Sequence, residues 1–295
     1  YESLYVCFGN FRGGLAIVSI LIGTIMAACI GVIAASISML TLVALPVMIQ
    51  RGYDNGLATG SICAGGTLGI LIPPSIMLIV YGPAAWISVG KLFMAAFGPG
   101  LMLSVLYMIY IAVRSFLQPS MAPSVSAEEQ GNYTNFQKLK MVVTSLVPTL
   151  LLILSVLGAI YSGIAAPTEA AAVGAVVSII LTACYGQFSW KDLMEVSQGT
   201  IKLTCMVLLI AACSTAFVSV FLAGGGGQIV ESFILDFPGG KWAVFAAIMA
   251  ITFVLGAFID WVGIIFVLVP ILSPIIPRLR FDPLWFAMMI IVNLQ

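Results

Sequence analysis

The sequence contains no histidine and few charged residues of either sign. Without histidine, the chain has no imidazole for metal binding, proton relay or general-base catalysis near neutral pH. Charged residues make up 7% of the chain, and 11 basic residues balance 11 acidic ones. Soluble domains usually carry roughly 25% charged residues. The composition therefore cannot give a soluble protein of this size a polar surface, and it offers no basic stripe for a nucleic acid.

Several signatures of catalytic and metal sites are also missing. The six cysteines form no CxxC pair and stand mostly within apolar runs, which is typical of small core residues. No HExxH or GxSxG motif is present. The four glycines at 224–227 lack the following Lys-Ser/Thr of a phosphate loop, so we interpret them as a hinge or a tight helix crossing. We expect neither an enzyme nor a bound cofactor.

Hydrophobic residues, in contrast, make up 62% of the chain, and the mean hydropathy is +1.19. Lipid is the natural solvent for such a surface, and helices are the simplest structure that satisfies the backbone there. We therefore expect an all-α integral membrane protein that crosses the bilayer several times. The chain does not begin with methionine and stops in an apolar run, so we expect a fragment lacking its N-terminal start and C-terminal end.

Two of the apolar runs are unsuited to a single continuous span of about 20 residues. Residues 15–49 form a run that is too long and is interrupted by glycine and proline, which predicts a span plus a re-entrant segment, or two half-helices, with a hairpin tip near residues 31–38. Residues 57–86 are interrupted by Gly65, Gly66, Gly69 and the pair Pro73-Pro74, and two adjacent prolines remove two backbone donors. We therefore predict a broken helix there. Residues 97–117 and 141–162 are predicted as plain spans, 167–185 as a helix of small residues, and 204–223 as a further span.

The order of features suggests an internal repeat. Ten residues separate Ser36 from Pro46, and ten separate Asp260 from Pro270. Asp54 precedes Gly65 by eleven residues, as Asp282 precedes Asn293, while the connectors differ in length by four. Interrupted hydrophobic segments at corresponding positions indicate a transporter binding site, because unwound backbone in a bilayer needs partners such as an ion or a substrate.

From these features we predict four parts of the chain. Residues 1–117 form a first repeat, a hairpin plus a broken helix, with the span that follows it. Residues 118–140 form a polar loop, and residues 141–240 form central spans with a Pro-Thr-Glu helix. Residues 241–295 form a second, incomplete repeat.

The segment 65–75, GGTLGILIPPS, resembles the signature of the large membrane subunit of TRAP transporters (tripartite ATP-independent periplasmic transporters, the DctM-like family). Residues 166–170, APTEA, resemble the second signature of that family, and residues 260–274 and 281–283 also fit. The resemblance covers nearly the whole chain. Two departures are the absence of a second Pro-Pro break after Asn293 and a first hairpin tip where only Ser36 and Ser38 keep hydroxyl groups.

The resemblance implies an inverted-repeat, elevator-type transporter with two re-entrant helical hairpins and broken helices in the bacterial inner (cytoplasmic) membrane. It implies sodium-coupled import of small organic acids, with sodium ions as coupling ions and no other cofactor. The implied partners are a periplasmic solute-binding protein that delivers the organic acid, a small membrane subunit of the same permease, and the lipid bilayer.

Candidate substrate- or ion-binding residues lie at the hairpin tips, the breaks and the Pro-Thr-Glu helix: Ser36, Ser38, Gly65, Gly66, Thr67, Gly69, Pro73, Pro74, Thr168, Glu169, Asp260 and Asn293. Sodium is expected at Gly65, Thr67 and Gly69, where freed carbonyls and a hydroxyl offer hard oxygen ligands, and near Asp260 and Asn293. No catalytic residue is expected.

Each candidate also has a purely structural interpretation. The break at 65–74 would then be a kink at a packing contact, with Thr168 as a helix N-cap and Glu169 as a first-turn acid. Asp260 would be a hairpin-tip residue open to water. At the level of function, a channel and a non-transporting structural subunit remain as alternatives. A channel needs a continuous polar pore, whereas the polar residues here gather at two breaks.

Overall fold

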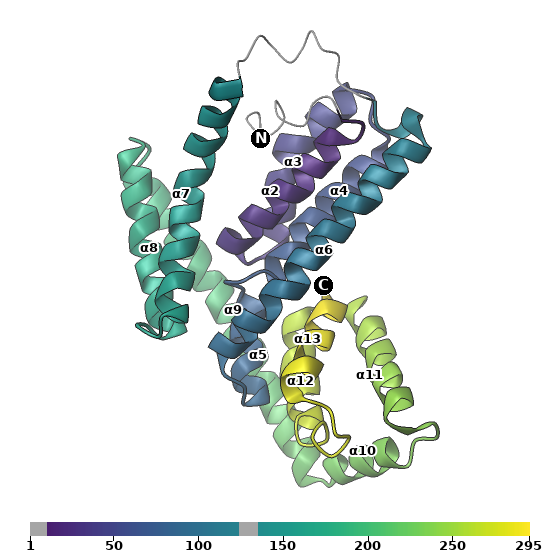
Figure 1. The fold of residues 1–295 in the computed structure, drawn as a ribbon. Helices are drawn as coiled ribbons and strands as arrows, with labels where there is room; N and C mark the ends of the chain where they lie inside the picture. The colour runs from purple at the N-terminus through teal and green to yellow at the C-terminus, as the bar shows by residue number, and fades with distance from the viewer. Residues whose placement is uncertain (1–10, 124–134) are drawn as a thin grey trace. The chain divides into compact units, whose positions relative to one another are not determined.

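The computed structural model describes residues 11–123 and 135–295, and every regular element in these ranges is a helix (Figure 1). Among the described residues, four helices are long and apolar enough to cross a membrane: α3 (Ile33–Gln50), α6 (Val89–Leu117), α8 (Pro167–Cys184) and α9 (Trp190–Ala223). The fold thus agrees with the predicted all-α membrane protein.

The chain divides into two compact units, which are described separately. The first unit holds the described residues up to 76 and those from 96 to 178. The second unit holds residues 77–95 and 179–295. Each unit contains one of the two predicted hairpins and the helix that follows it.

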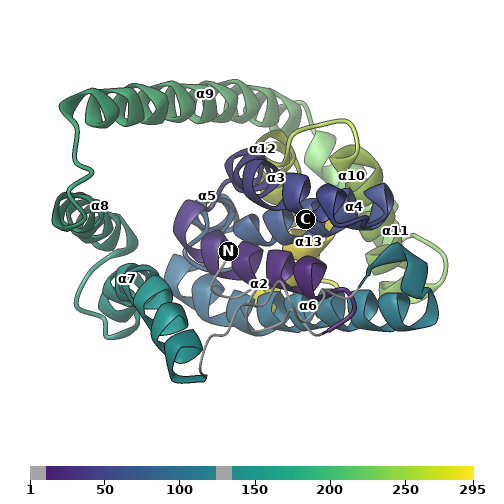
Figure 2. The same ribbon diagram turned by 90° about the horizontal axis from the view of Figure 1, so that it is seen from above.

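The first unit is built around a helical hairpin. α2 (Gly14–Ile30) and α3 are joined by Gly31 and Val32, and Gly31 has a φ of +63° that favours glycine. The long run at 15–49 is therefore two helices, as predicted. α4 (Asn55–Thr67) lies beside both, and the three helices run together in both views (Figures 1 and 2). Buried apolar side chains fill the space between them: Leu15, Ile20, Leu40, Met48, Ile62 and Leu68.

Glycine sets the distance between these helices. A Cβ atom added to Gly23 of α2 would lie 2.6 Å from the carbonyl oxygen of Gly65 on α4. A Cβ atom on Gly66 would lie 2.3 Å from Cγ1 of Ile37 and 3.0 Å from its backbone nitrogen. These approaches leave no room for a larger side chain, so the hairpin and α4 pack backbone to backbone, as small residues allow in membranes.

The rest of the first unit follows α4. A 3-10 helix, η1 (Leu68–Ile70), and an irregular stretch interrupt the chain before α5 (Ile76–Ala85). α6, the short η2 (Pro119–Met121), α7 (Asn135–Tyr161) and α8 come next. The predicted span at 97–117 is confirmed within α6. α7 begins at Asn135, inside the stretch 118–140 predicted as a loop, of which 124–134 lie outside the described residues.

The second unit contains α9, a single helix of 34 residues that starts well before the predicted span at 204–223 (Figure 2). Gly225, with a φ of +84°, forms the tight turn into α10 (Gly226–Leu235), so the glycine run is a turn between helices. The unit continues with α11 (Gly240–Gly256), α12 (Trp261–Leu272) and α13 (Pro283–Leu294). Arg278, which follows α12, is ion-paired with Glu231 of α10.

The helix boundaries reveal that α11, α12 and α13 repeat α2, α3 and α4. α2 and α11 each have 17 residues. The residue before each of them is a glycine with a positive φ, Gly13 and Gly239. The N-caps of the next two helices are 22 residues apart in both cases, at Val32 and Asp54 and again at Asp260 and Asp282.

This register differs from the one predicted from proline spacing. Aligning the N-caps pairs Pro46 with Pro274 instead of Pro270, and pairs Asp260 with Val32 instead of Ser36. The predicted four-residue difference between the connectors then disappears. Proline tolerates several positions near a helix end, whereas the cap fixes where the helix begins, so the cap is the better marker of register.

The same positions are in contact in both repeats. Leu15 is the second residue of α2, and its backbone nitrogen lies 3.3 Å from the Tyr53 hydroxyl. Lys241 is the second residue of α11, and its Nζ lies 5.3 Å from the ring centroid of Phe281, the counterpart of Tyr53. The tenth residue of α2 is Gly23, and the tenth residue of α11 is Met249. Gly23 abuts Gly65, and Met249 accepts a hydrogen bond of 2.8 Å from the side-chain nitrogen of Asn293, the counterpart of Gly65.

The close crossing of α2 and α4 yields a testable prediction. Gly23→Ala should lower the free energy of unfolding by about 1–3 kcal/mol, because the new methyl group meets backbone that cannot move aside. Gly60→Ala is the matched control on α4, since a Cβ there meets nothing within 4 Å. It should instead stabilise the helix by about 0.5–1 kcal/mol. Thermal unfolding in detergent measures both, and equal effects would contradict the packing described here.

Candidate functional site

The predicted interruption after α4 is present in the structure. α4 ends at Thr67, η1 covers one turn, and residues 71–75 form no helix before α5 begins at Ile76. The carbonyl of Leu68 accepts hydrogen bonds from the backbone nitrogens of Leu71 at 3.1 Å and Ile72 at 3.0 Å. The hydroxyl of Ser75 donates to the carbonyl of Ile70. The segment is therefore a compact, ordered break rather than a kinked continuation of α4.

The glycines and the prolines of this segment act differently. Gly65 and Gly66 belong to the last turns of α4, where they allow the close crossings with α2 and α3. The described glycines with a positive φ lie elsewhere, so these two are not needed for unusual backbone angles. Pro73 and Pro74 lie in the non-helical stretch and cannot donate backbone hydrogen bonds. The packing interpretation thus applies to Gly65 and Gly66, whereas the prolines keep the helix from continuing.

The tip of the first hairpin lies against this break. A Cβ atom on Gly31 would be 3.4 Å from the carbonyl oxygen of Pro74 and 3.6 Å from the backbone nitrogen of Ile76. The Ser36 hydroxyl is buried and donates to the carbonyl of Val32 at the tip, at 3.0 Å. Ser38 is exposed on α3. The structure therefore joins Gly31 to the break, keeps Ser36 near the tip, and leaves Ser38 on the surface.

Helix α6 holds the same region with polar side chains that the sequence did not single out. The hydroxyls of Ser104 and Thr24 are hydrogen-bonded at 2.6 Å, which ties α6 to α2. The side chain of Tyr107 is hydrogen-bonded to that of Thr67, the last residue of α4, and the Thr67 hydroxyl also donates to Ala64 at 3.0 Å. The three-residue spacing of Ser104 and Tyr107 on one helical face was the available signal within a span predicted to be plain.

In the second repeat, Asp260 has a clear structural role. It is exposed at the hairpin tip and is the N-cap of α12, where its carboxylate accepts a hydrogen bond from the backbone nitrogen of Val262 at 3.2 Å. Asn293 is half-buried and donates to Met249 of α11. A Cβ atom added to Gly256 at the end of α11 would lie 3.5 Å from Cδ2 of Leu294, so the tip of this hairpin also approaches the helix that follows it.

Thr168 and Glu169 both lie exposed in the first turn of α8. Since α8 begins at Pro167, Thr168 is inside the helix, and its predicted role as an N-cap is wrong. Glu169 does complement the helix start, because its carboxylate accepts a hydrogen bond of 3.0 Å from the backbone nitrogen of Ala166. This is one half of a capping box, because Ala166 has no side-chain oxygen to return the hydrogen bond.

The oxygen atoms at the break suit a hard cation. Among the described residues, no three His, Cys, Asp or Glu side chains gather as a metal cluster. The donors beside Thr67 are instead a hydroxyl and the backbone carbonyls of an interrupted helix, which is the donor set that membrane transporters offer to Na⁺.

Comparison with known proteins agrees with this architecture. The family model described as "Tripartite ATP-independent periplasmic transporter, DctM component" matches residues 1–295. The C4-dicarboxylate TRAP transporter large permease protein DctM of Pseudomonas aeruginosa is 35% identical over 292 residues, which cover 98% of this chain and 66% of the relative. A putative TRAP transporter large permease protein of Haemophilus influenzae is 32% identical over 291 residues, covering 97% of this chain and 70% of the relative.

A third relative, the C4-dicarboxylate permease protein DctM of Rhodobacter capsulatus, is 30% identical over 305 residues, covering 97% of this chain and 67% of the relative. The chain spans about two thirds of the length of these relatives. All are named as transporter permeases rather than enzymes, and membrane-spanning helices fit an inner-membrane location. The chain belongs to the DctM family, the large membrane permease components of TRAP transporters.

Proposed function

We propose that this protein forms the solute-translocating part of a sodium-coupled TRAP transporter that imports small organic acids. The observation that carries the proposal is the ordered break at 68–75, with the hairpin-tip glycine Gly31 against Pro74 and with Tyr107 of α6 hydrogen-bonded to Thr67 just before the break. A hairpin tip beside an interrupted helix brings backbone groups that lie outside regular helix close to one another, which suits an ion-coupled carrier.

For the solute, the names of the relatives provide candidates. Three relatives that are 30–35% identical are named as C4-dicarboxylate permeases. Others are named for isethionate in Oleidesulfovibrio alaskensis and for 2,3-diketo-L-gulonate in Escherichia coli, at 30% and 27% identity. C4-dicarboxylates are therefore the first solutes to test, followed by other small organic acids.

For the coupling ion, we propose sodium at the first break. The Thr67 hydroxyl, with carbonyls around Gly65 and Gly69, would supply hard oxygen ligands. Tyr107 and Ser104 would hold that site in place through their bonds to Thr67 and Thr24. In the second repeat, Asp260 and Asn293 are proposed to lie near a second sodium ion. An ion that orders the solute surface raises solute affinity, and the solute raises ion affinity by the same factor.

We further propose that the permease works with a periplasmic solute-binding protein and a small membrane subunit. The family description, tripartite and periplasmic, supports these partners, and the isethionate relative is named as a DctMQ permease protein. The large exposed apolar surfaces of α8 and α9 are available to lipid or to such a membrane subunit. An elevator-type movement of two inverted repeats belongs to the same proposal.

Two alternatives compete with this proposal, a channel and a structural subunit without a substrate. Neither needs an ordered break in contact with a hairpin tip. Uptake of labelled C4-dicarboxylate into liposomes holding the full permease and its partners separates them. A carrier gives saturable uptake that depends on a sodium gradient, a channel gives uptake that does not saturate, and a structural subunit gives none.

One prediction of the proposed function concerns the two prolines of the break. The double variant Pro73→Ala, Pro74→Ala should lower sodium affinity by roughly tenfold, the equivalent of one lost charge-assisted hydrogen bond, because the segment can then wind into helix and withdraw its carbonyls. Sodium-dependent uptake in liposomes measures this. Pro46→Ala, within α3, is the control and should retain sodium affinity. Unchanged uptake and sodium affinity in the double variant would make the break a packing feature only.

Another prediction of the proposed function concerns Asp260. Asn is as good an N-cap as Asp, so Asp260→Asn should keep α12 intact while removing the charge. If the carboxylate helps to balance a sodium ion, sodium affinity should fall by about tenfold with little change in thermal stability. Asp282→Asn is the matched control, because Asp282 caps α13 through Trp285 at 2.8 Å and is not a proposed ligand. Equal sodium affinity in both variants would mean that Asp260 only caps α12 and does not contribute to sodium binding.

A further inference from the structure

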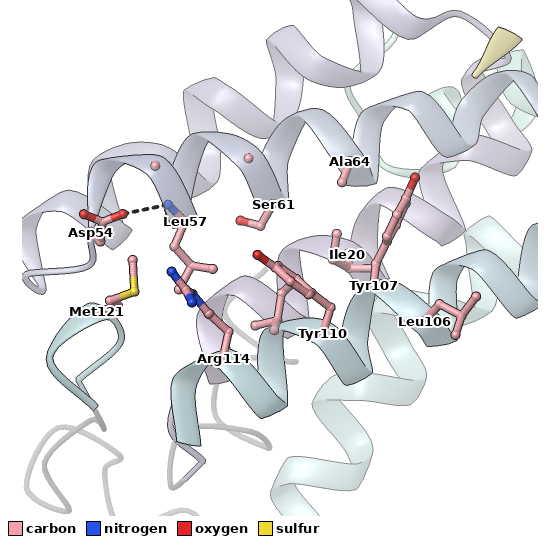
Figure 3. A pocket seen from close by; sticks show the side chains of 13 residues that line it. Ile20, Asp54, Leu57, Ser61, Ala64, Leu106, Tyr107, Tyr110, Arg114 and Met121 are labelled. Carbon is pink, nitrogen blue, oxygen red and sulfur yellow. Dashed lines mark hydrogen bonds between the residues drawn. The ribbon is translucent and has the colours of Figure 1, made fainter. Parts of the chain in front are cut away.

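A cavity of about 630 Å³ lies within the first unit, between α4, α6 and η2, and its lining includes Ala64 and Tyr107 near the break. Its volume falls in the range of small-ligand sites. Five of its lining side chains are polar: Asp54, Ser61, Tyr107, Tyr110 and Arg114. Figure 3 shows Arg114 and Tyr110 of α6 directed toward Leu57 and Ser61 of α4, with Asp54 and Met121 at one end.

A row of small residues along α4 leaves room for the cavity. Gly56, Gly60 and Ala64 recur at every fourth position and all line it. Such a stripe usually lets a second helix pack closely. Here a Cβ atom on Gly60 would meet nothing within 4 Å, and one on Gly56 would approach only Oδ1 of Asp54, at 3.1 Å. The stripe therefore faces open space rather than a neighbouring helix.

The second repeat lacks this feature. In the register fixed by the N-caps, the counterparts of Gly56, Gly60 and Ala64 are Leu284, Met288 and Val292. Met288 is only 4% exposed, so a large side chain is buried where the first repeat leaves a gap. The small residues are thus not required by the shared helical arrangement.

The cavity carries one positive and one negative group that do not neutralise each other directly. Arg114 lies in the last turn of α6, and Asp54 is the N-cap of α4. One oxygen of Asp54 accepts a hydrogen bond from the backbone nitrogen of Leu57 at 3.0 Å, and the other is left for a ligand. Among the described residues, neither side chain takes part in an ion pair. A ligand with both an anionic and a cationic group would match this pair.

The position of the cavity favours a lipid over a dissolved solute. Both charged residues stand at helix ends, where membrane helices meet the headgroup region. Away from these ends the lining becomes apolar, with Ile20, Ala64 and Leu106. Tyr110 is 63% exposed and Leu106 50% exposed along α6, so the cavity opens sideways, toward the hydrocarbon that surrounds a membrane-spanning helix.

We propose that this cavity binds a phospholipid whose headgroup carries a phosphate and a primary ammonium group, the phosphatidylethanolamine class. The Arg114 guanidinium binds the phosphate, for which its planar donors are suited. The free oxygen of Asp54 accepts a hydrogen bond from the ammonium group. The acyl chains leave past Leu106 and Ala64, and the missing side chain at Gly60 makes room for the glycerol portion.

Native mass spectrometry of the purified full-length permease with added lipids tests this proposal. The wild type should bind phosphatidylethanolamine about tenfold more tightly than phosphatidylglycerol, which has the phosphate but no ammonium group. Arg114→Gln should weaken both lipids by about tenfold. Asp54→Asn, which keeps the N-cap, should weaken phosphatidylethanolamine alone and so remove the preference. Equal binding of the two lipids by the wild type would overturn the assigned headgroup.

A third variant fills the cavity with methionine, the residue that stands at the corresponding position of the second repeat. Gly60→Met introduces the side chain found at Met288 into open space, so folding should be retained while lipid binding falls by at least about tenfold. Asp282→Asn, the matched change at the other N-cap, should leave lipid binding unchanged. If Gly60→Met folds and binds phosphatidylethanolamine as the wild type does, or if the wild type binds no lipid, the cavity is not a lipid site and the proposal is wrong.

Discussion

A bilayer offers no hydrogen bonds to a peptide group, and this constraint shapes most of the structure. Helices satisfy it internally, which is why the regular elements in residues 11–123 and 135–295 are helical. One exception in the first unit is the stretch after Thr67, where α4 stops and α5 has not begun. That stretch is enclosed by Gly31 at the hairpin tip and by Ile72 packed against Gly100 of α6. Irregular backbone is thus tolerated where protein surrounds it.

The sequence was sufficient for the elements whose signals are local. The apolar runs, the glycine at 31 and the prolines at 73 and 74 correctly predicted helices, a hairpin tip and a break. The register of the repeat was less accessible, because it is fixed by where α3 and α12 begin. Val32 is an unremarkable N-cap in sequence, whereas Asp260 is a typical one, and prolines supplied a misleading alignment.

For the candidate site, local sequence identified the segment but not its surroundings. Thr67 was predicted from its place in a motif, while its partner Tyr107 lies forty residues later in a span where its three-residue spacing from Ser104 is the one signal and names no partner. Thr24 and Ser104 are equally inconspicuous, because hydroxyl groups in apolar helices usually bond to their own backbone. Pairings between helices depend on the tertiary arrangement, which residue spacing within one helix does not encode.

The helix crossing between α2 and α4 recurs between α11 and α13, but the contact at the crossing differs between the two repeats. In the first, Gly23 and Gly65 touch through their backbones, and dispersion of this kind weakens sharply once two surfaces part by half an ångström. In the second, a side-chain amide of Asn293 reaches the carbonyl of Met249, and its rotatable bonds can follow that carbonyl as it moves. The crossing of α2 and α4 therefore resists relative displacement of its helices, whereas the crossing of α11 and α13 tolerates it. A load applied along the helices would be taken up by sliding between α11 and α13, while α2 and α4 would move as one body.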